Sequence, residues 1–292
     1  MFHVLGAGII ADIDTGVDPD HPALKQILLK GYYFTRNQPG GSEMNDFSGP
    51  PPNTNTSNIA RVNQSTAAVL DQSTAAVLDG NPQYAAFGHG TIVLGVIHLV
   101  APRANLLPLK AFNSSGNGFL SDILRGVYFA VQNGASVISM SFDFKTSSTE
   151  FNNAVDFARQ NGLICVASAG NDGIQEIVYP AALQNDVMGV ASTSDVDMRS
   201  TFSNYGNAIV WVAAPGEAII STYPFGTYAA SSGTSFSAPF VSGAGSLLLD
   251  LNKNVDEPGA AAAIANAVPI GDGMGNGRLD LVLALQFMSK HN

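Results

Sequence analysis

The sequence predicts a three-layer α/β fold built on a doubly wound, mostly parallel β-sheet. Short apolar runs rich in β-branched residues alternate with stretches of helical periodicity, which is typical of parallel βαβ units. The chain has 292 residues, of which 46% are hydrophobic, so it can bury a large core. Length alone allows one domain or two, because such folds often reach about 250 residues as one unit.

Six apolar runs are expected to form strands of this sheet. They are residues 9–14, 105–110, 137–142, 163–168, 187–191 and 209–213. Helices between them have recognisable ends. Ser121 is expected to open a helix that stops near Asn133, and Ser147 with Glu150 matches a capping box for a helix that ends near Asn161.

Residues 38–84 depart from this alternation. Residues 38–64 are crowded with Pro, Gly, Asn and Ser, which favours a surface loop. Residues 64–71 and 72–79 are then the same eight residues, QSTAAVLD, written twice. One tandem copy is too short for a solenoid, so we interpret 38–84 as a surface insertion formed by local duplication. A lid or an autoprocessing site near the active centre is the alternative.

Composition excludes several classes of partner. The 23 acidic and 13 basic residues give a net charge of −10, and no Lys or Arg cluster offers a footprint for nucleic acid. The longest apolar stretches are too short to span a bilayer, so we expect no membrane insertion. Cys165 is the only cysteine, which excludes an intrachain disulfide. The first residues lack the basic and apolar regions of a secretory signal peptide.

Three residues could supply an acid, a base and a nucleophile. Asp14 ends an apolar strand, so its carboxylate should emerge at the carboxyl edge of the sheet, where α/β sites lie. His89 lies between two glycines just ahead of an apolar helical pattern. Ser235 precedes a helix of small residues expected at 240–251, where backbone N–H groups can bind an oxyanion. Each alone has a structural explanation, such as a turn or a helix cap, and only the combination indicates catalysis.

These segments resemble the Asp, His and Ser motifs of the subtilases, the subtilisin-like serine peptidases, and they occur in the order of that family. A fourth segment resembles the strand end that carries the oxyanion-hole asparagine of the family. The resemblance covers about residues 6–285 and implies a single subtilisin-like domain spanning residues 1–292. The matching stretches are Ile13-Asp14-Thr15-Gly16, Gly88-His89-Gly90-Thr91, Ala169-Gly170-Asn171 and Gly233-Thr234-Ser235.

The resemblance implies a serine endopeptidase that works through an acyl-enzyme intermediate. His89 would take the proton of Ser235, and Asp14 would hold the imidazole tautomer. Asn171 and the backbone N–H of Ser235 would bind the oxyanion. Substrate would pair as an added β-strand between two strand ends, which gives broad sequence tolerance. The residues implied in substrate binding are Ser139, Ser141, Phe142, Ser168, Ala169 and Gly170.

Two positions depart from the family pattern. Asp143 stands where the family usually has Gly, and with the bulk of Phe142 and Phe144 it should change the side-chain preference of the cleft. Asp12 stands where the family usually has an apolar strand residue. We expect no direct catalytic role for Asp12, and a buried carboxyl that perturbs the triad is the alternative.

The resemblance also bears on cofactors, partners and location. The chemistry requires no cofactor. Ala23 follows His21-Pro22 where calcium-binding relatives often carry Asp, so we expect the principal calcium site of the family to be absent. Calcium at other sites stays open. Expected partners are polypeptide substrates and a removed propeptide, and we expect a monomer. Most subtilases are secreted, so we expect a secreted bacterial-type protein, with an intracellular form as the alternative.

Two other hypotheses remain open. Residues 9–15 resemble the Asp-x-Asp strand of haloacid-dehalogenase-type phosphohydrolases, with Asp12 as nucleophile and magnesium as cofactor, but this leaves His89 and Ser235 unexplained. The other hypothesis is a catalytically impaired subtilisin-like binding module, in which the altered cleft around Phe142 and Asp143 is no longer productive.

Overall fold

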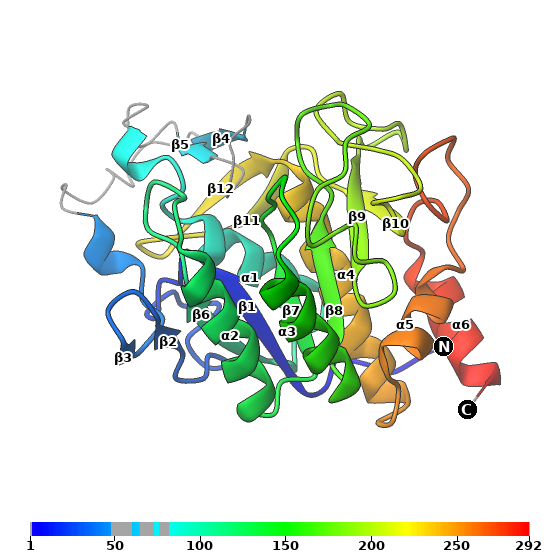
Figure 1. Cartoon of the computed structure of the whole chain (residues 1–292), viewed down its shortest axis with the longest axis horizontal. Coiled ribbons are helices and arrows are strands. Elements are labelled where there is room, and N and C mark those ends of the chain that lie inside the picture. The colour runs from blue at the N-terminus through cyan, green and yellow to red at the C-terminus, as the bar shows by residue number, and fades with distance from the viewer. Residues whose placement is uncertain (1, 48–59, 65–72, 76–81, 292) are drawn as a thin grey trace.

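The computed structural model describes residues 2–47, 60–64, 73–75 and 82–291. Its main element is an eight-stranded sheet that is parallel throughout except at its last strand (Figure 1). In sheet order the strands are β10 (Val212–Pro215), β9 (Met188–Thr193), β8 (Ile164–Ser168), β7 (Val137–Met140), β1 (Ile9–Asp14), β6 (Asn105–Lys110), β2 (Tyr32–Tyr33) and β3 (Gln38–Pro39).

Helices cover both faces of this sheet, which confirms the predicted three-layer α/β fold (Figure 1). Helices α1 (His89–Val100) and α4 (Thr234–Leu251) pack against each other on one face. Helices α2 (Leu120–Gln132) and α3 (Thr149–Gln160) pack together on the other. Helices α5 (Glu257–Ile264) and α6 (Leu281–Lys290) lie beside α4.

The side chains of β1 alternate between the two faces of the sheet. Ile10 belongs to the core between the sheet and α1 and α4, whereas Ala11 and Ile13 belong to the core on the α2 and α3 side. Because successive strand residues point to opposite faces, Asp12 and Asp14 share the face of Ile10. Strand β1 therefore directs two carboxyl groups toward the side of the sheet that α1 and α4 cover.

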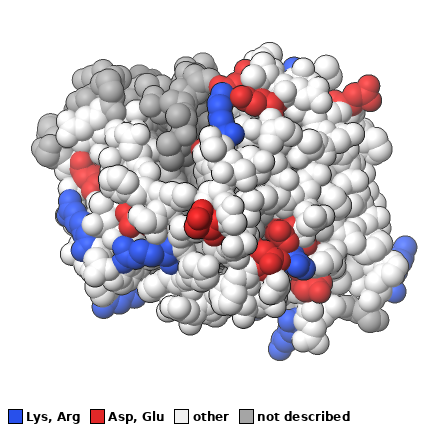
Figure 2. Space-filling model, in the orientation of Figure 1, with Lys and Arg blue, Asp and Glu red and all other residues white. Residues whose placement is uncertain are grey.

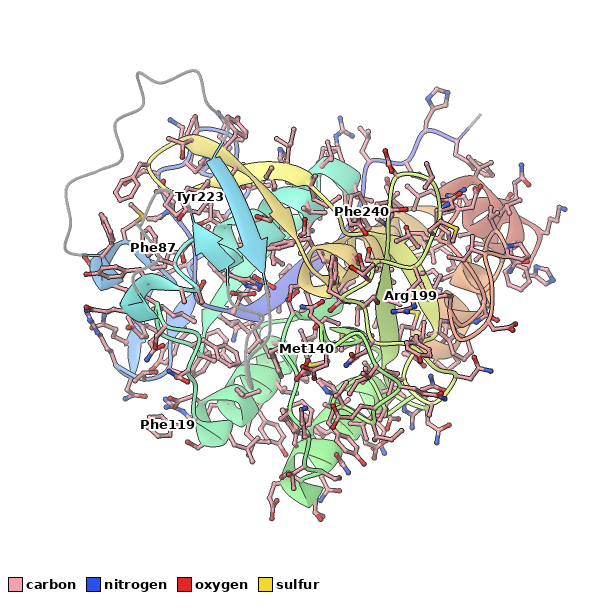
Figure 3. All side chains as sticks on the ribbon, turned by 90° about the horizontal axis from the view of Figure 1, so that it is seen from above. Phe87, Phe119, Met140, Arg199, Tyr223 and Phe240 are labelled. Carbon is pink, nitrogen blue, oxygen red and sulfur yellow. The ribbon has the colours of Figure 1, made fainter. Side chains whose placement is uncertain are left out.

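Strand β1 also lies where the chain changes direction through the sheet. Its neighbours are β6 on one side and β7 on the other, and β8, β9 and β10 follow outward from β7. In open α/β sheets, functional sites form outside the carboxyl ends of the strands at such a point. Met140, the last residue of β7, lies near the middle of the molecule when it is seen from above (Figure 3).

A smaller sheet lies beside the main one, with the order β11-β12-β4-β5. Antiparallel β11 (Ile219–Tyr223) and β12 (Thr227–Ser232) come from the region before α4. Strands β4 (Ala60–Gln64) and β5 (Ser73–Ala75) come from the 38–84 segment, and β4 pairs in parallel with β12. Most of the QSTAAVLD repeat lies outside the described residues.

The predicted strand limits agree with the structure at β1 and β6 and differ elsewhere. Strand β7 ends at Met140 instead of residue 142. Strand β10 begins at Val212 instead of residue 209, because the N–H groups of Ile209 and Val210 both donate to the carbonyl of Gly206 in a turn. An apolar run alone cannot distinguish a buried turn from a strand.

Three predicted local features are wrong. Helix α3 is capped by Ser148, whose Oγ accepts from the Phe151 N–H at 3.3 Å, instead of by Ser147. Helix α2 begins at Leu120, one residue before Ser121. Part of the predicted surface loop is buried, because Glu43 is only 1% exposed. The composition of a segment reports its average environment and does not identify individual buried residues.

Glu257 provides a test of the packing of α5. Its side chain is 3% exposed, and burial, followed by the nearby charge of Asp186, raises the pKa of its carboxyl to about 7. The unfolded chain loses this proton at about pH 4.3, so the contribution to stability is full below that pH and lost as pH rises through 7. Glu257→Gln is therefore expected to stabilise the fold at pH 8 by about 1–3 kcal/mol and to change little at pH 4. Thermal melts at both pH values measure this, and an equal change at both would contradict it.

Candidate active site

Asp14 and His89 form a buried pair where β1 ends and α1 begins. His89 Nδ1 lies 2.8 Å from both Asp14 Oδ1 and Oδ2, and both side chains are at most 1% exposed. A carboxylate only accepts hydrogen bonds, so Nδ1 is the donor. This tautomer makes Nε2 the basic nitrogen of the ring.

Close approach of α1 to β1 depends on a glycine. A Cβ added to Gly90 would lie 2.1 Å from the carbonyl oxygen of Gly16, so any larger residue would push the helix start away. With α1 this close to β1, Gly90 N donates to Thr15 Oγ1 at 3.0 Å. The Gly-His-Gly motif therefore lets the backbone carrying His89 contact the backbone that follows Asp14.

Ser235 lies in the first turn of α4, which begins at Thr234 and not near residue 240 as predicted. Pro239 is inside the helix and has no N–H to donate to the Ser235 carbonyl four residues earlier. That carbonyl accepts instead from Ser141 Oγ at 3.0 Å, and Ser235 Oγ donates to the Ser141 carbonyl at 3.2 Å. This reciprocal pair fixes the start of α4 against the segment that follows β7.

The three candidate catalytic residues come together because α1 and α4 pack side by side. The ring of Phe236, next to Ser235, lies 5.5 Å from the His89 ring, measured between centroids. His89 and Ser235 are both fully buried.

Asn171 follows β8 and faces the same helix start. Its Oδ1 accepts from the Thr234 N–H at 2.8 Å, which orients the amide. Its Nδ2 is buried and has no hydrogen-bond partner among the described residues. A buried donor without a partner costs about 1–3 kcal/mol, so such groups are expected where a ligand supplies the acceptor. Because Thr234 directly precedes Ser235, the Asn171 amide is suited to bind an oxyanion that develops at Ser235.

Comparisons with known proteins identify the family of this chain. A model of the subtilase family matches residues 7–279. The chain belongs to the subtilase family. Thermitase from Thermoactinomyces vulgaris is 34% identical over 282 residues, covering 95% of this chain and 88% of thermitase. An intracellular serine protease from Paenibacillus polymyxa is 32% identical, covering 94% and 80% of the two chains. The crystal structure of a cold adapted subtilisin-like serine proteinase matches with a TM-score of 0.75 and 27% identity over 96% of this chain and 90% of that one.

These relatives show that the chain is a subtilisin-like serine endopeptidase. The phosphohydrolase hypothesis loses its basis, because Asp12 is 1% exposed inside the sheet and the Asp14 carboxylate is bound by His89.

The cleft of this subtilase differs in part from the sequence prediction. Ser139 is fully buried and has register partners on both sides, Asp12 on β1 and Val166 on β8, so its backbone pairs within the sheet. Ser168 is also fully buried and pairs with Val190 on β9. The Phe142 side chain is fully buried, with its ring centroid 5.2 Å from that of Phe112, so it packs in the core instead of lining the cleft. Ser141 lies beside Ser235, whose Oγ donates to the Ser141 carbonyl.

Asp143 follows Ser141 by two residues and lies against the segment that contains Gly170 and Asn171. A Cβ added to Gly170 would be 2.8 Å from Asp143 Oδ2, which places the carboxylate against the backbone just before Asn171. Ala169 precedes this glycine, and its N–H donates to the carbonyl of Val190. The departure at position 143 therefore puts a carboxyl group next to Gly170, one of the residues expected to bind substrate.

Asp12 lies behind the triad of the subtilase, two residues before Asp14. Burial first, then the charges of Asp14 and Glu43, raise the pKa of the Asp12 carboxyl well above its usual value. Its register partners are Ser139 on β7 and Pro108 on β6. The expectation that Asp12 has no direct catalytic role stays a prediction.

In the described part of the chain, no group of three or more His, Cys, Asp or Glu side chains is placed to hold a metal ion. His21, expected near the family calcium site, instead contacts the Thr227 carbonyl through Nε2 at 2.9 Å. The expectation about calcium stays a prediction. No helix among the described residues is long and apolar enough to cross a membrane.

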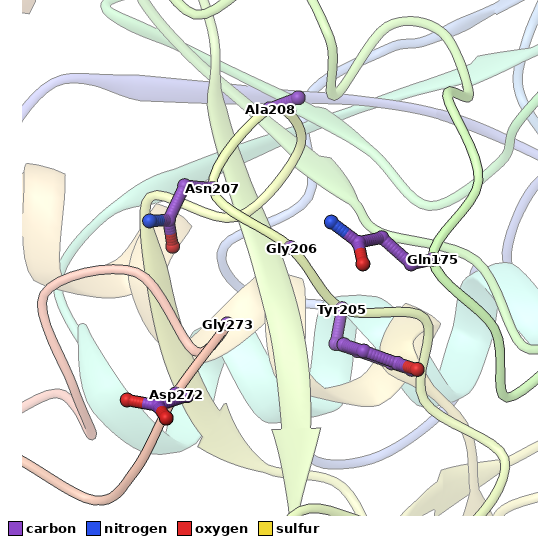
Figure 4. A pocket seen from close by; sticks show the side chains of 7 residues that line it. All are labelled: Gln175, Tyr205, Gly206, Asn207, Ala208, Asp272 and Gly273. Atoms are coloured by element: carbon purple, nitrogen blue, oxygen red, sulfur yellow. The ribbon is translucent and has the colours of Figure 1, made fainter.

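A separate pocket of about 350 Å³ lies away from these residues (Figure 4). Neither the triad nor Asn171 lines it. Its lining residues are Gln175, Tyr205, Gly206, Asn207, Ala208, Asp272 and Gly273.

Proposed function

We propose that this subtilase cleaves polypeptides through Asp14, His89 and Ser235. Ser235 Oγ attacks the peptide carbonyl and gives its proton to His89 Nε2, while Asp14 stabilises the imidazolium. The tetrahedral intermediate then collapses, and the leaving amine takes the proton from His89. Water attacks the acyl-enzyme by the same path and releases the acid.

The observation that carries this proposal is the buried Nδ2 of Asn171 that lacks a partner beside the start of α4. The oxyanion would accept from this amide and from the backbone N–H of Ser235 in the first turn of α4. Such preorganised donors act most strongly in a buried site from which water is excluded.

Substrates are expected to be polypeptides of varied sequence. Backbone pairing along the segment around Ser141 and Gly170 tolerates many side chains. The carboxylate of Asp143 adds an attraction for basic groups in this part of the cleft. On the face drawn in Figure 2, basic and acidic side chains are scattered among neutral ones, without a broad basic area among the coloured residues.

Cleavage of unfolded casein and of a fluorogenic peptide library tests the proposal. We expect turnover that a serine-directed sulfonyl fluoride blocks, with faster cleavage of peptides carrying Lys or Arg on the acyl side of the scissile bond. Casein that binds but stays intact would support the binding-module alternative instead.

We also propose that the protein is a secreted monomer, folded with a propeptide that is later removed. Family resemblance supports secretion, but the Paenibacillus polymyxa relative is named as intracellular. Fractionation of the source cells distinguishes these locations.

A further inference from the structure

Glu43 is a buried carboxylate that the mechanism above does not use. It follows β3, in the segment that composition assigns to a surface loop, yet it is 1% exposed. Its backbone is bound to the loop after β1, because Glu43 N donates to the Val17 carbonyl at 3.1 Å and Val17 N donates to the Gly41 carbonyl at 2.9 Å. The position of this side chain is therefore fixed by its own backbone.

The Glu43 carboxylate accepts hydrogen bonds from two separate elements. Its Oε2 accepts from Thr15 Oγ1 at 3.0 Å and from Gly88 N at 2.8 Å. Its Oε1 accepts from Thr91 Oγ1. Thr15 belongs to the loop after β1, whereas Gly88 and Thr91 belong to the start of α1.

Both threonine hydroxyls are oriented so that their protons point to Glu43. Thr15 Oγ1 accepts from Gly90 N of α1 at 3.0 Å, and Thr91 Oγ1 accepts from Asp18 N of the β1 loop at 2.8 Å. Each hydroxyl thus accepts from the opposite element and donates its single proton to the carboxylate. The hydroxyl protons of Thr15 and Thr91 therefore need an acceptor between them, and the Glu43 carboxylate supplies it.

The hydrogen bonds to Glu43 involve the chain neighbours of Asp14 and His89. Thr15 directly follows Asp14, and Gly88 directly precedes His89. We propose that Glu43 is a positioning residue that holds Asp14 and His89 in their mutual geometry by joining the two backbone segments that carry them. This proposal rests on the proposed function, since positioning matters to turnover only if the triad is catalytic.

The charges around Glu43 fit a fixed structural role. Burial raises the pKa of its carboxyl to about 7, while the three hydrogen bonds and Lys110 act in the opposite direction. Lys110 is itself fully buried, and its Nζ lies 2.7 Å from Asp46 Oδ2. Asp12 on β1 and Tyr223 on β11 also interact electrostatically with the Glu43 carboxyl group. Moving this buried carboxylate would break the three hydrogen bonds that it accepts, at a cost in free energy. Such a residue can fix the positions of the backbone segments that it joins.

Glu43→Gln tests the proposal, with Glu257→Gln as the matched control. Both residues are buried glutamates with pKa values raised to about 7, but Glu257 lies in α5, away from the triad. Glutamine keeps the size of the side chain and one acceptor oxygen, but it cannot accept from all three donors. We expect kcat to fall about tenfold or more with KM nearly unchanged in Glu43→Gln, because small misplacement of catalytic groups is costly. We expect wild-type kcat in Glu257→Gln.

Thr15→Val provides a second variant with nearly the same side-chain volume. It removes one donor to Glu43 and the acceptor for Gly90 N, so kcat should fall here as well. The effects of Thr15→Val and Glu43→Gln should be clearly less than additive in the double variant, since both disrupt one network. If Glu43→Gln does not fold, wild-type kcat in Thr15→Val overturns the proposal.

The proton on His89 Nδ1 gives a readout that does not need turnover. In nuclear magnetic resonance spectra, Glu43→Gln should shift or broaden this proton, and Glu257→Gln should leave it as in the wild type. If the wild-type chain proves inactive, the proposed function fails and the Nδ1 resonance alone decides about Glu43. With an active wild type, a folded Glu43→Gln variant with wild-type kcat overturns the proposal.

Discussion

Ser235→Ala is expected to lower kcat for a peptide substrate by about a millionfold, the size of effect that removing the nucleophile has in a member of this family. The change removes the Oγ that forms the acyl-enzyme and one hydrogen bond, from Oγ to the Ser141 carbonyl. The reverse bond, from Ser141 Oγ to the Ser235 carbonyl, uses the backbone of residue 235 and is retained. The fold should therefore persist, and initial-rate kinetics at a known protein concentration measure the loss.

Ser237→Ala is the matched control for this prediction. Ser237 lies in the same turn of α4, is also fully buried, and donates to the Pro215 carbonyl at 3.2 Å. We expect its kcat to stay close to that of the wild type. Residual activity in Ser235→Ala of more than about a hundredth of the wild-type value would contradict the assignment of Ser235 as nucleophile.

Asn171→Ala is expected to have the second largest effect. Loss of one oxyanion donor costs about 2.7–4 kcal/mol, or about 10²–10³ in kcat, a magnitude taken from a member of this same family. KM should change little, because the Nδ2 donor has its strongest interaction with charge that develops in the transition state. Steady-state kinetics on one peptide substrate separate the two parameters.

Stability should respond much less than rate in this variant. Alanine removes the acceptor of the Thr234 N–H, at a cost of about 1 kcal/mol, but it also removes the buried Nδ2 that has no partner among the described residues. Asn266→Ala is a suitable control, because its Nδ2 donates to the Ala262 carbonyl at 2.8 Å in α5. A fall in kcat of less than about tenfold in Asn171→Ala would exclude its amide as an oxyanion donor.

The sequence was sufficient to predict the layers of the fold and the strand end that carries Asp14. Alternating apolar runs placed Asp14 at the end of β1, and the structure puts it there. These features depend on local sequence, so local patterns predict them.

Features that depend on distant contacts could not be predicted in the same way. The helix of small residues was expected at 240–251, but Ser141 satisfies the Ser235 carbonyl that Pro239 leaves without a helical donor, and α4 begins six residues earlier. Glu43 lies among loop-forming residues, and only the folded chain shows that Thr15 and Thr91 surround it. The burial of Phe142 likewise comes from its packing against Phe112, far away in sequence.

The most direct test of the central claim, that Asp14, His89 and Ser235 act as one nucleophilic unit, is mass spectrometry after reaction with a serine-directed sulfonyl fluoride. Among the serines of the chain, only one with an adjacent base should react quickly. The predicted result is a single adduct on the peptide containing Ser235, formed at a greatly reduced rate in His89→Ala and Asp14→Asn. Labelling at another serine, or equal labelling of Ser235 in the wild type and in His89→Ala, would contradict the account.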